Sequence, residues 1–179
     1  MLGWLALLTC VQASDSEAWS SLRDGRAVLL LRHATAPGIG DPANFQLGDC
    51  TTQRNLSQQG REEAQRWGKL LRSQWIEQPR IFSSRWCRAQ DTASEMGVGA
   101  VEPLPALDSF FETRERAQQQ TAELIEQLNA MARGAPIVLV SHQVNISALT
   151  EVYPASGEGL ILALPLSAPA QVLARIPPP

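Results

Sequence analysis

The chain alternates continuous apolar runs with segments whose apolar residues recur at helical spacing. Residues 27–31 and 136–140 are short apolar runs, the pattern of strands that are covered on both faces. The segments 80–83, 160–164 and 172–176 predict further strands, the last two as a closing pair. Segments 88–96, 114–131 and the stretch after His142 predict helices. Strands that alternate with helices predict a three-layer α/β/α sandwich with a mostly parallel central sheet.

A helix beginning after Ser57 has the clearest amphipathic pattern. Ser57 is a suitable N-cap, and Pro79 ends the segment. The apolar stripe consists of Ala64, Trp67, Leu70, Leu71 and Trp75. This spacing predicts that both tryptophans belong to the core.

The first residues resemble an export signal. Residues 1–11 are mostly apolar, and the small residue Ala13 precedes a polar segment, although no lysine or arginine precedes the run. The run is shorter than the ~20 residues that span a bilayer, so we expect no membrane span. A signal peptide at 1–13, cleaved near Ala13, would leave 14–179 as a single domain exported to a bacterial periplasm. The alternatives are a first strand or helix of the fold, and a lipid anchor at Cys10.

Two cysteines remain after removal of such a signal, Cys50 and Cys87. An even number in an oxidising compartment is compatible with a disulfide. That bridge would close a loop of roughly 38 residues and contribute ~3–4 kcal/mol in the chain-entropy model. The alternative is two buried free thiols.

Composition narrows the possible functions. With 44% apolar and 18% charged residues and a net charge of −3, the chain is typical of a globular protein. It has no basic tail or run, which argues against a nucleic-acid partner. No cluster of histidine, cysteine and carboxylate residues has metal-ligand spacing, so we expect neither a metal nor a cofactor. The oligomeric state is not readable from the sequence.

The candidate chemistry lies at two predicted strand ends. Arg32 and His33 follow the first central strand, and His142 follows the second; the chain has no other histidine. Ligands of such sheets bind beyond the carboxyl ends of the strands. Arginine is a permanently charged, bidentate partner for phosphate, and a neutral imidazole is a good nucleophile toward phosphorus.

Four segments, in order, resemble the motifs of the histidine phosphatase superfamily, also called phosphoglycerate-mutase-like proteins. They are Leu31-Arg32-His33-Ala34, with alanine where the family has glycine; Arg54-Asn55-Leu56-Ser57-Gln58-Gln59-Gly60; Ser83-Ser84-Arg85-Trp86-Cys87-Arg88-Ala89-Gln90-Asp91-Thr92-Ala93; and Val140-Ser141-His142. The resemblance spans about residues 27–149 and is strongest to the small phosphohistidine-phosphatase-like branch. It implies the phosphoglycerate-mutase-like form of the sandwich.

The resemblance implies a role for each matched residue. His33 would be the nucleophile that forms a phosphohistidine, and His142 would donate a hydrogen bond to the phosphoryl group. Arg32 and Arg88 would bind the phosphoryl oxygens. Arg54 is expected at the rim of the pocket or within the phosphate site. Arg85 stands where the family often has proline, and we expect it on the solvated surface.

The general acid is not matched directly. The family's glutamate would fall on Ser109, so Asp108 and Glu112 are the candidates, with Glu158 a distant third. A site without a strong acid favours substrates with good leaving groups. Separately, Phe45, Phe110 and Phe111 are expected either in the core or as an apolar wall beside the phosphate.

These inferences predict a metal-independent phosphatase that hydrolyses a small phosphomonoester or phosphoramidate. Two alternatives stay open. A phosphomutase of the same family would need a phosphodonor and usually a longer chain. A non-catalytic phosphate-binding module would keep the fold without turnover.

Overall fold

The computed structural model describes residues 15–179. The predicted signal peptide at 1–13 and the candidate lipid site Cys10 lie outside this range. One six-stranded sheet has the order β3-β2-β4-β1-β5-β6. The strands are β1 (Ala27–Arg32), β2 (Arg80–Ser83), β3 (Val101–Pro103), β4 (Ile137–Ser141), β5 (Gly159–Ala163) and β6 (Val172–Ile176). Neighbouring strands are parallel from β3 to β1, whereas β5 runs antiparallel to both β1 and β6.

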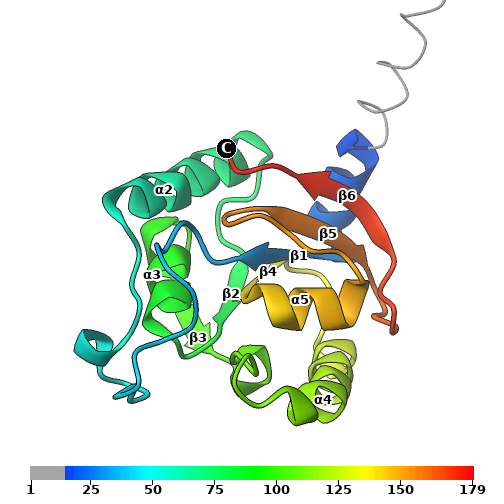
Figure 1. The fold of residues 1–179 in the computed structure, drawn as a ribbon. Helices are drawn as coiled ribbons and strands as arrows, with labels where there is room; N and C mark the ends of the chain where they lie inside the picture. Colours follow the sequence, from blue (N-terminus) through cyan, green and yellow to red (C-terminus); the bar gives the residue numbers. More distant parts are fainter. Residues whose placement is uncertain (1–14) are drawn as a thin grey trace, which may run out of the picture.

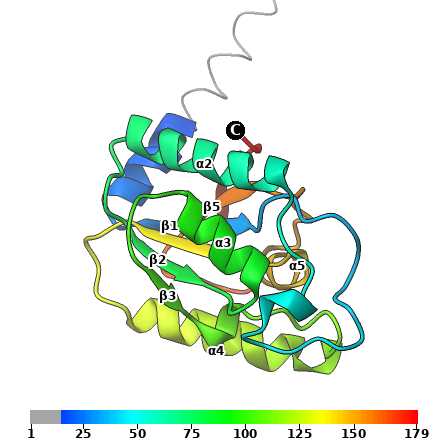
Figure 2. The same ribbon diagram turned by 90° about the vertical axis from the view of Figure 1, so that its left-hand side faces the viewer.

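Helices cover both faces of the sheet. They are α2 (Gln58–Ser73), α3 (Cys87–Glu95), α4 (Ala117–Ala130) and α5 (Gln143–Thr150), joined by the short 3-10 turns η1 (Cys50–Thr52), η2 (Pro105–Leu107) and η3 (Arg114–Arg116). Residues 15–23 are also helical and pack with α2 and α3 on one face, while α4 and α5 pack on the other. Figures 1 and 2 show the sheet between these two layers. The predicted three-layer, mostly parallel α/β/α sandwich is therefore confirmed.

The pairing of β1 with β4 brings the two histidines together. Arg32 is in register with Ser141, and the His33 backbone N–H donates to the Ser141 carbonyl oxygen at 2.9 Å. Because β1 and β4 are parallel neighbours, the segments that follow them leave the sheet at the same end, the carboxyl ends of the strands. His33 and His142, each one residue beyond its strand, consequently lie side by side.

Helix α2 follows its predicted pattern except at the end. The Ser57 side chain accepts a hydrogen bond from Gly60 N–H, as expected of an N-cap. Trp67 is fully buried, and its indole N–H donates to the Gly157 carbonyl oxygen. The prediction for Trp75 is wrong: the helix ends at Ser73, and Trp75 takes a positive φ of 61° and is 81% exposed. The chain leaves the helix before the stripe reaches Trp75.

Two glycines allow α2 to approach its neighbours closely. A Cβ at Gly60 would lie 2.2 Å from the Thr35 carbonyl oxygen, and one at Gly68 would lie 1.8 Å from the Met96 carbonyl oxygen. No real side chain tolerates such distances. The first contact places the start of α2 against the segment that follows His33.

Other elements differ from the sequence prediction. The segment predicted as one helix from 114 to 131 begins with the η3 turn and becomes α-helical at Ala117. Two elements were not predicted from the sequence: the three-residue strand β3, and the helix at 15–23, which directly follows the predicted signal peptide. Both are too short to show a clear period. Within residues 15–179, no helix is long and apolar enough to cross a membrane.

Candidate active site

His33 presents one ring nitrogen to a cavity at the edge of the sheet. Its Nδ1 lies 2.8 Å from the Ala34 carbonyl oxygen, which can only accept a hydrogen bond. Nδ1 therefore carries the proton, and Nε2 has a free electron pair. The Arg88 Nε–H donates to this Nε2 at 3.3 Å. The imidazole is 2% exposed and lines the cavity through this face.

Both histidines are held in the neutral form. Burial, reinforced by the charges of Arg88, Arg54 and Arg32, lowers the pKa of His33 to about 3. Burial also lowers the pKa of His142 well below its usual value, with His33 and the same arginines acting in the same direction. A neutral imidazole with a free Nε2 is the form that can attack phosphorus.

Arg88 joins the two histidines. Its side chain is 3% exposed, and its Nη2 lies 3.5 Å from His142 Nδ1. The ring centroids of His33 and His142 are 5.4 Å apart. The Nε and Nη2 edge of the guanidinium thus faces both rings, the geometry that arginine uses to bind an oxyanion with two hydrogen bonds.

Arg32 and Arg54 add positive charge to the same cavity. Arg32 Nη1 donates to the Pro154 carbonyl oxygen at 2.9 Å, while its buried Nε has no hydrogen-bond partner within residues 15–179. Arg54 donates through Nε to the Gly40 carbonyl oxygen at 2.8 Å and through Nη1 to that of Ala36. Burial and then the charge of Arg88 lower the pKa of both arginines. The cavity is therefore a concentration of buried positive charge that an anion would neutralise.

Ser84 links His142 to Asp108 on the other side of the site. Ser84 Oγ lies 2.8 Å from His142 Nε2 and donates to Asp108 Oδ1 at 3.4 Å. Asp108 also accepts from Arg85, at 2.8 Å from its backbone N–H and 2.7 Å from its Nε. Arg85 is exposed, as expected of a surface arginine, but its ion pair with Asp108 and its place in the cavity wall were not predicted.

The candidate acids differ in their surroundings. Asp108 is buried, and both of its oxygens accept hydrogen bonds. Glu112 lines the same cavity but is exposed and makes no hydrogen bond or ion pair to any residue in 15–179. Glu158 is paired with Arg175 and does not line the cavity. Asp41, whose carboxylate is ion-paired with Arg88 at 2.8 Å, was not predicted as a site residue. It lies in a glycine- and proline-rich loop, whose sequence predicts only a turn.

The cavity is larger than a phosphate group requires. Its volume is about 950 Å³, and it is lined by the histidines, arginines and carboxylates described above. Phe45 and Phe111 lie in its wall, as one of the two expectations for these aromatics had it. Phe45 stacks on Trp86 with ring centroids 5.1 Å apart. Phe110 instead is a core residue, 4% exposed.

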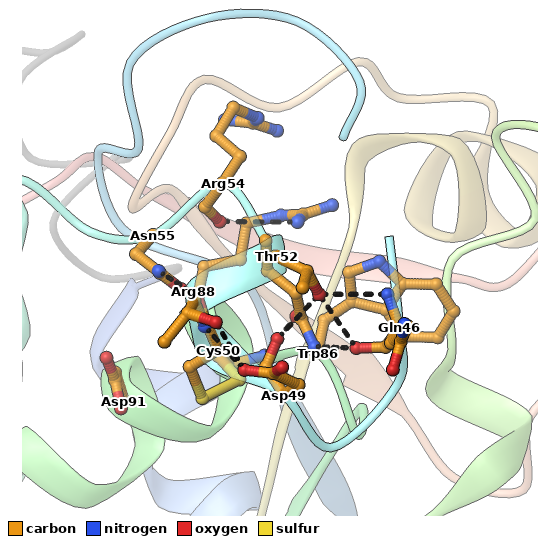
Figure 3. The surroundings of a disulfide bond; sticks show 12 residues. Gln46, Asp49, Cys50, Thr52, Arg54, Asn55, Trp86, Arg88 and Asp91 are labelled. Carbon is orange, nitrogen blue, oxygen red and sulfur yellow. Dashed lines mark hydrogen bonds between the residues drawn. A yellow bond between two sulfur atoms is a disulfide. The ribbon is translucent and has the colours of Figure 1, made fainter. Parts of the chain in front are cut away.

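A disulfide joins the loop before α2 to the first residue of α3. Cys50 and Cys87 are bonded, as the first of the two readings of the cysteines predicted. Cys87 directly precedes Arg88, and its N–H donates to Gln53 Oε1 at 2.9 Å. Figure 3 shows Arg54, Trp86 and Arg88 around this bond. The disulfide thus ties the loop that carries Arg54 to the helix that carries Arg88.

The fold of this chain is similar to that of solved structures of histidine phosphatases. The scan against protein-family models and the search of curated proteins found no match. The search of solved structures found many chains with this fold. Within residues 15–179, no group of three or more histidine, cysteine, aspartate or glutamate residues is arranged to hold a metal ion.

Three of the similar structures illustrate the range of proteins that share this fold. The protein histidine phosphatase SixA complexed with tungstate is 21% identical, with a TM-score of 0.53, and the match covers 85% of this chain and 97% of that one. Mycobacterial hydrolase 1 is 18% identical, with a TM-score of 0.58 and coverage of 82% and 96%. A mycobacterial glucosyl-3-phosphoglycerate phosphatase is 19% identical, with a TM-score of 0.53 and coverage of 77% and 90%. The predicted resemblance is thereby confirmed for the fold.

Proposed function

We propose that this protein is a histidine phosphatase that hydrolyses a small phosphorylated substrate through a phosphohistidine on His33. The observation that carries the proposal is the unprotonated Nε2 of His33 beside Arg88 in a cavity of positive charge. The similarity in fold to phosphatases, one of them with bound tungstate, supports it. Tungstate is a tetrahedral oxyanion like phosphate.

The reaction follows from the geometry in two displacements. His33 Nε2 attacks phosphorus, the bond from phosphorus to the leaving oxygen or nitrogen breaks, and the leaving atom takes up a proton. Water then attacks the phosphohistidine and gives a proton back to the acid that protonated the leaving atom, the P–N bond breaks, and inorganic phosphate leaves with His33 neutral again. Arg32, Arg88 and Arg54 stabilise the charge on the phosphoryl oxygens throughout, because they are already in place before the reaction.

The main test compares wild type with His33→Ala on p-nitrophenyl phosphate without added metal. We expect phosphate release and an acid-labile phosphoenzyme in wild type, and neither in the variant. Arg88→Ala should reduce kcat/KM by about 10²–10³-fold, the usual cost of removing a preorganised donor. Arg61→Ala, in an arginine paired with Asp91 and Glu95 outside the cavity, is the matched control. Full activity in His33→Ala would refute the mechanism.

The proton donor is a separate part of the proposal. Both Asp108 oxygens already accept hydrogen bonds from Arg85, whereas Glu112 lines the cavity without a hydrogen bond or ion pair to any residue in 15–179. We therefore assign the role of proton donor to the leaving group to Glu112, with Asp108 as the alternative. Glu112→Gln should slow the hydrolysis of alkyl phosphates, which have poor leaving groups, much more than the hydrolysis of p-nitrophenyl phosphate. If Asp108→Asn shows that selectivity and Glu112→Gln does not, the assignment is reversed.

The other candidate functions predict different results with the same protein. A phosphomutase would transfer its phosphoryl group to an added phosphosugar faster than to water. A binding module would take up tungstate without releasing phosphate from any ester. No observation in the structure favours either of them.

We also propose that the protein is exported to a periplasm, with residues 1–13 removed. The disulfide supports this, because such bonds persist in oxidising compartments. Intact mass of the periplasmically expressed protein should correspond to residues 14–179 and rise by two hydrogens after reduction. A mass that includes an acylated Cys10 would instead establish the lipid anchor.

A further inference from the structure

Asp41 makes a set of contacts that the proposed reaction does not use. It lies in the loop between β1 and α2, and three donors converge on its carboxylate. Arg88 Nη1 donates to Oδ1 at 2.8 Å, the Arg54 backbone N–H donates to Oδ1 at 3.1 Å, and the Trp86 indole N–H donates to Oδ2 at 3.0 Å. Burial opposes the ionisation of Asp41, but these hydrogen bonds outweigh it and lower its pKa.

The contact with Arg88 determines which edge of the guanidinium faces the reaction. Asp41 occupies Nη1, while Nε is directed at His33 and Nη2 at His142. The guanidinium group is planar, and its N–H directions are rigid. Anchoring one nitrogen to Asp41 therefore fixes the other two toward the space between the histidines.

Asp41 also balances charge in the cavity. Burial and then the like charge of Arg88 lower the pKa of Arg32 and of Arg54, as expected where cations share one cavity. The carboxylate of Asp41 has the opposite effect and raises the pKa of Arg88 and of Arg54. It is the carboxylate that contacts Arg88 directly among residues 15–179.

We infer that Asp41 is a positioning residue that acts through Arg88. It orients the Nε and Nη2 edge toward the phosphoryl group and holds the loop of residues 37–54 against α3. Both oxygens of Asp41 are taken by donors, so it serves neither as a proton donor nor as a ligand of the substrate. This inference rests on the proposed phosphatase function for its kinetic readout, but not for its binding readout.

The test is a double-mutant cycle on kcat/KM for p-nitrophenyl phosphate, with wild type, Asp41→Ala, Arg88→Ala and the double variant. Misplacing a group that stabilises the transition state costs about 10²-fold. We expect Asp41→Ala to lose that much, mainly in kcat, and the double variant to be no worse than Arg88→Ala within about threefold. Such non-additivity indicates that one residue acts through the other. If the loss of kcat/KM in the double variant equals the product of the losses in the two single variants, the inference is overturned.

A second variant and a control separate orientation from loop collapse. Asp41→Asn keeps an oxygen for Arg88 and should recover about tenfold of the loss in Asp41→Ala. Asp49→Asn, in an exposed aspartate of the same loop that accepts hydrogen bonds only from Thr51, should retain wild-type activity. An equal loss in Asp49→Asn and Asp41→Asn would overturn the orienting role.

The same double-mutant cycle can be measured without turnover, with the affinity of the four proteins for tungstate as the readout. If wild type binds tungstate but hydrolyses no ester, the proposed function fails. The inference about Asp41 then stands or falls on whether the losses in affinity are non-additive with Arg88→Ala. If wild type neither hydrolyses esters nor binds tungstate, both proposals are wrong.

Discussion

At the scale of residues, the site depends on the protonation of two buried histidines. The carbonyl oxygen of Ala34 determines the His33 tautomer, and burial beside arginines keeps both rings neutral. Neither property is visible in the dipeptide Arg32-His33. The sequence shows which groups are available, whereas the surroundings decide the protonation state in which they act.

Stability should fall at acidic pH because of this burial. The pKa of His33 is lowered to about 3 in the folded protein, against about 6.5 in the unfolded chain. The stabilisation is therefore complete above pH 6.5 and is lost as the pH falls from 6.5 toward 3. Urea unfolding at pH 7 and pH 4.5 should show a decrease of roughly 2 kcal/mol attributable to His33.

His33→Gln provides the control for that measurement. Its side chain does not titrate, so its free energy of unfolding should fall less between the two pH values than that of wild type. Equal decreases in the two proteins would show that other groups, such as His142 or the carboxylates, and not His33, cause the acid sensitivity.

Ser84 should matter for the hydrogen-bonding role of His142. Because the Ser84 hydroxyl donates to Asp108, it accepts a hydrogen bond from His142 Nε2–H, and the unprotonated Nδ1 accepts from Arg88 Nη2. Ser84→Ala removes this acceptor, and we expect kcat for p-nitrophenyl phosphate to fall by about tenfold, equivalent to one hydrogen bond of ~1.4 kcal/mol.

Ser83→Ala is a matched control for Ser84→Ala. Ser83 is equally buried, but its hydroxyl donates to the Ser84 carbonyl oxygen and forms no hydrogen bond with His33 or His142. Its kcat should remain close to that of wild type. A similar loss of kcat in both variants would mean that disturbed packing of β2, and not the His142 contact, is responsible.

At the scale of elements, parallel β1 and β4 bring the histidines together, and the loop before α2 adds Arg54 and Asp41. Five of the six strands were predicted correctly from apolar runs, because each run is a local property of the chain; β3 and the order of the strands in the sheet were not. The loop contacts were not predictable in this way. Asp41 and Arg88 are 47 residues apart, and no periodicity connects a loop residue with the partner that packing gives it.

The disulfide is the covalent link between these elements. Cys50→Ser combined with Cys87→Ser should lower the free energy of unfolding by roughly 3 kcal/mol, since the bond closes a long loop of the unfolded chain. KM should also rise, because the segment that carries Arg54 is no longer tied to α3. Urea unfolding and steady-state kinetics of the double variant would measure both effects.

Wild type treated with reductant is the internal control for the cysteine substitutions. It should reproduce both changes, whereas the double variant should not respond to reductant. An unchanged KM in reduced wild type would show that the hydrogen bonds of Asp41 are sufficient to hold the loop.

At the scale of the whole molecule, oxyanion binding should stabilise the native state. A ligand that binds only the folded protein adds about 2.7 kcal/mol at a hundred times its Kd. Tungstate should therefore raise the Tm of wild type in a concentration-dependent manner. Thermal unfolding of Arg88→Ala should show little of this shift, while Arg61→Ala should show all of it. A full shift in Arg88→Ala would place the oxyanion outside the cavity.

The sequence by itself determined the α/β/α architecture, the pairing of two strand ends that carry histidines, and the arginines that accompany them. These follow from local periodicity and from motif order, which a single chain displays directly. Only the tertiary structure decided that Asp41 holds Arg88, that Arg85 pairs with Asp108, and that Trp75 leaves the core. Such contacts depend on how loops and helix ends meet after the sheet is assembled, and this packing is not encoded in the spacing of neighbouring residues.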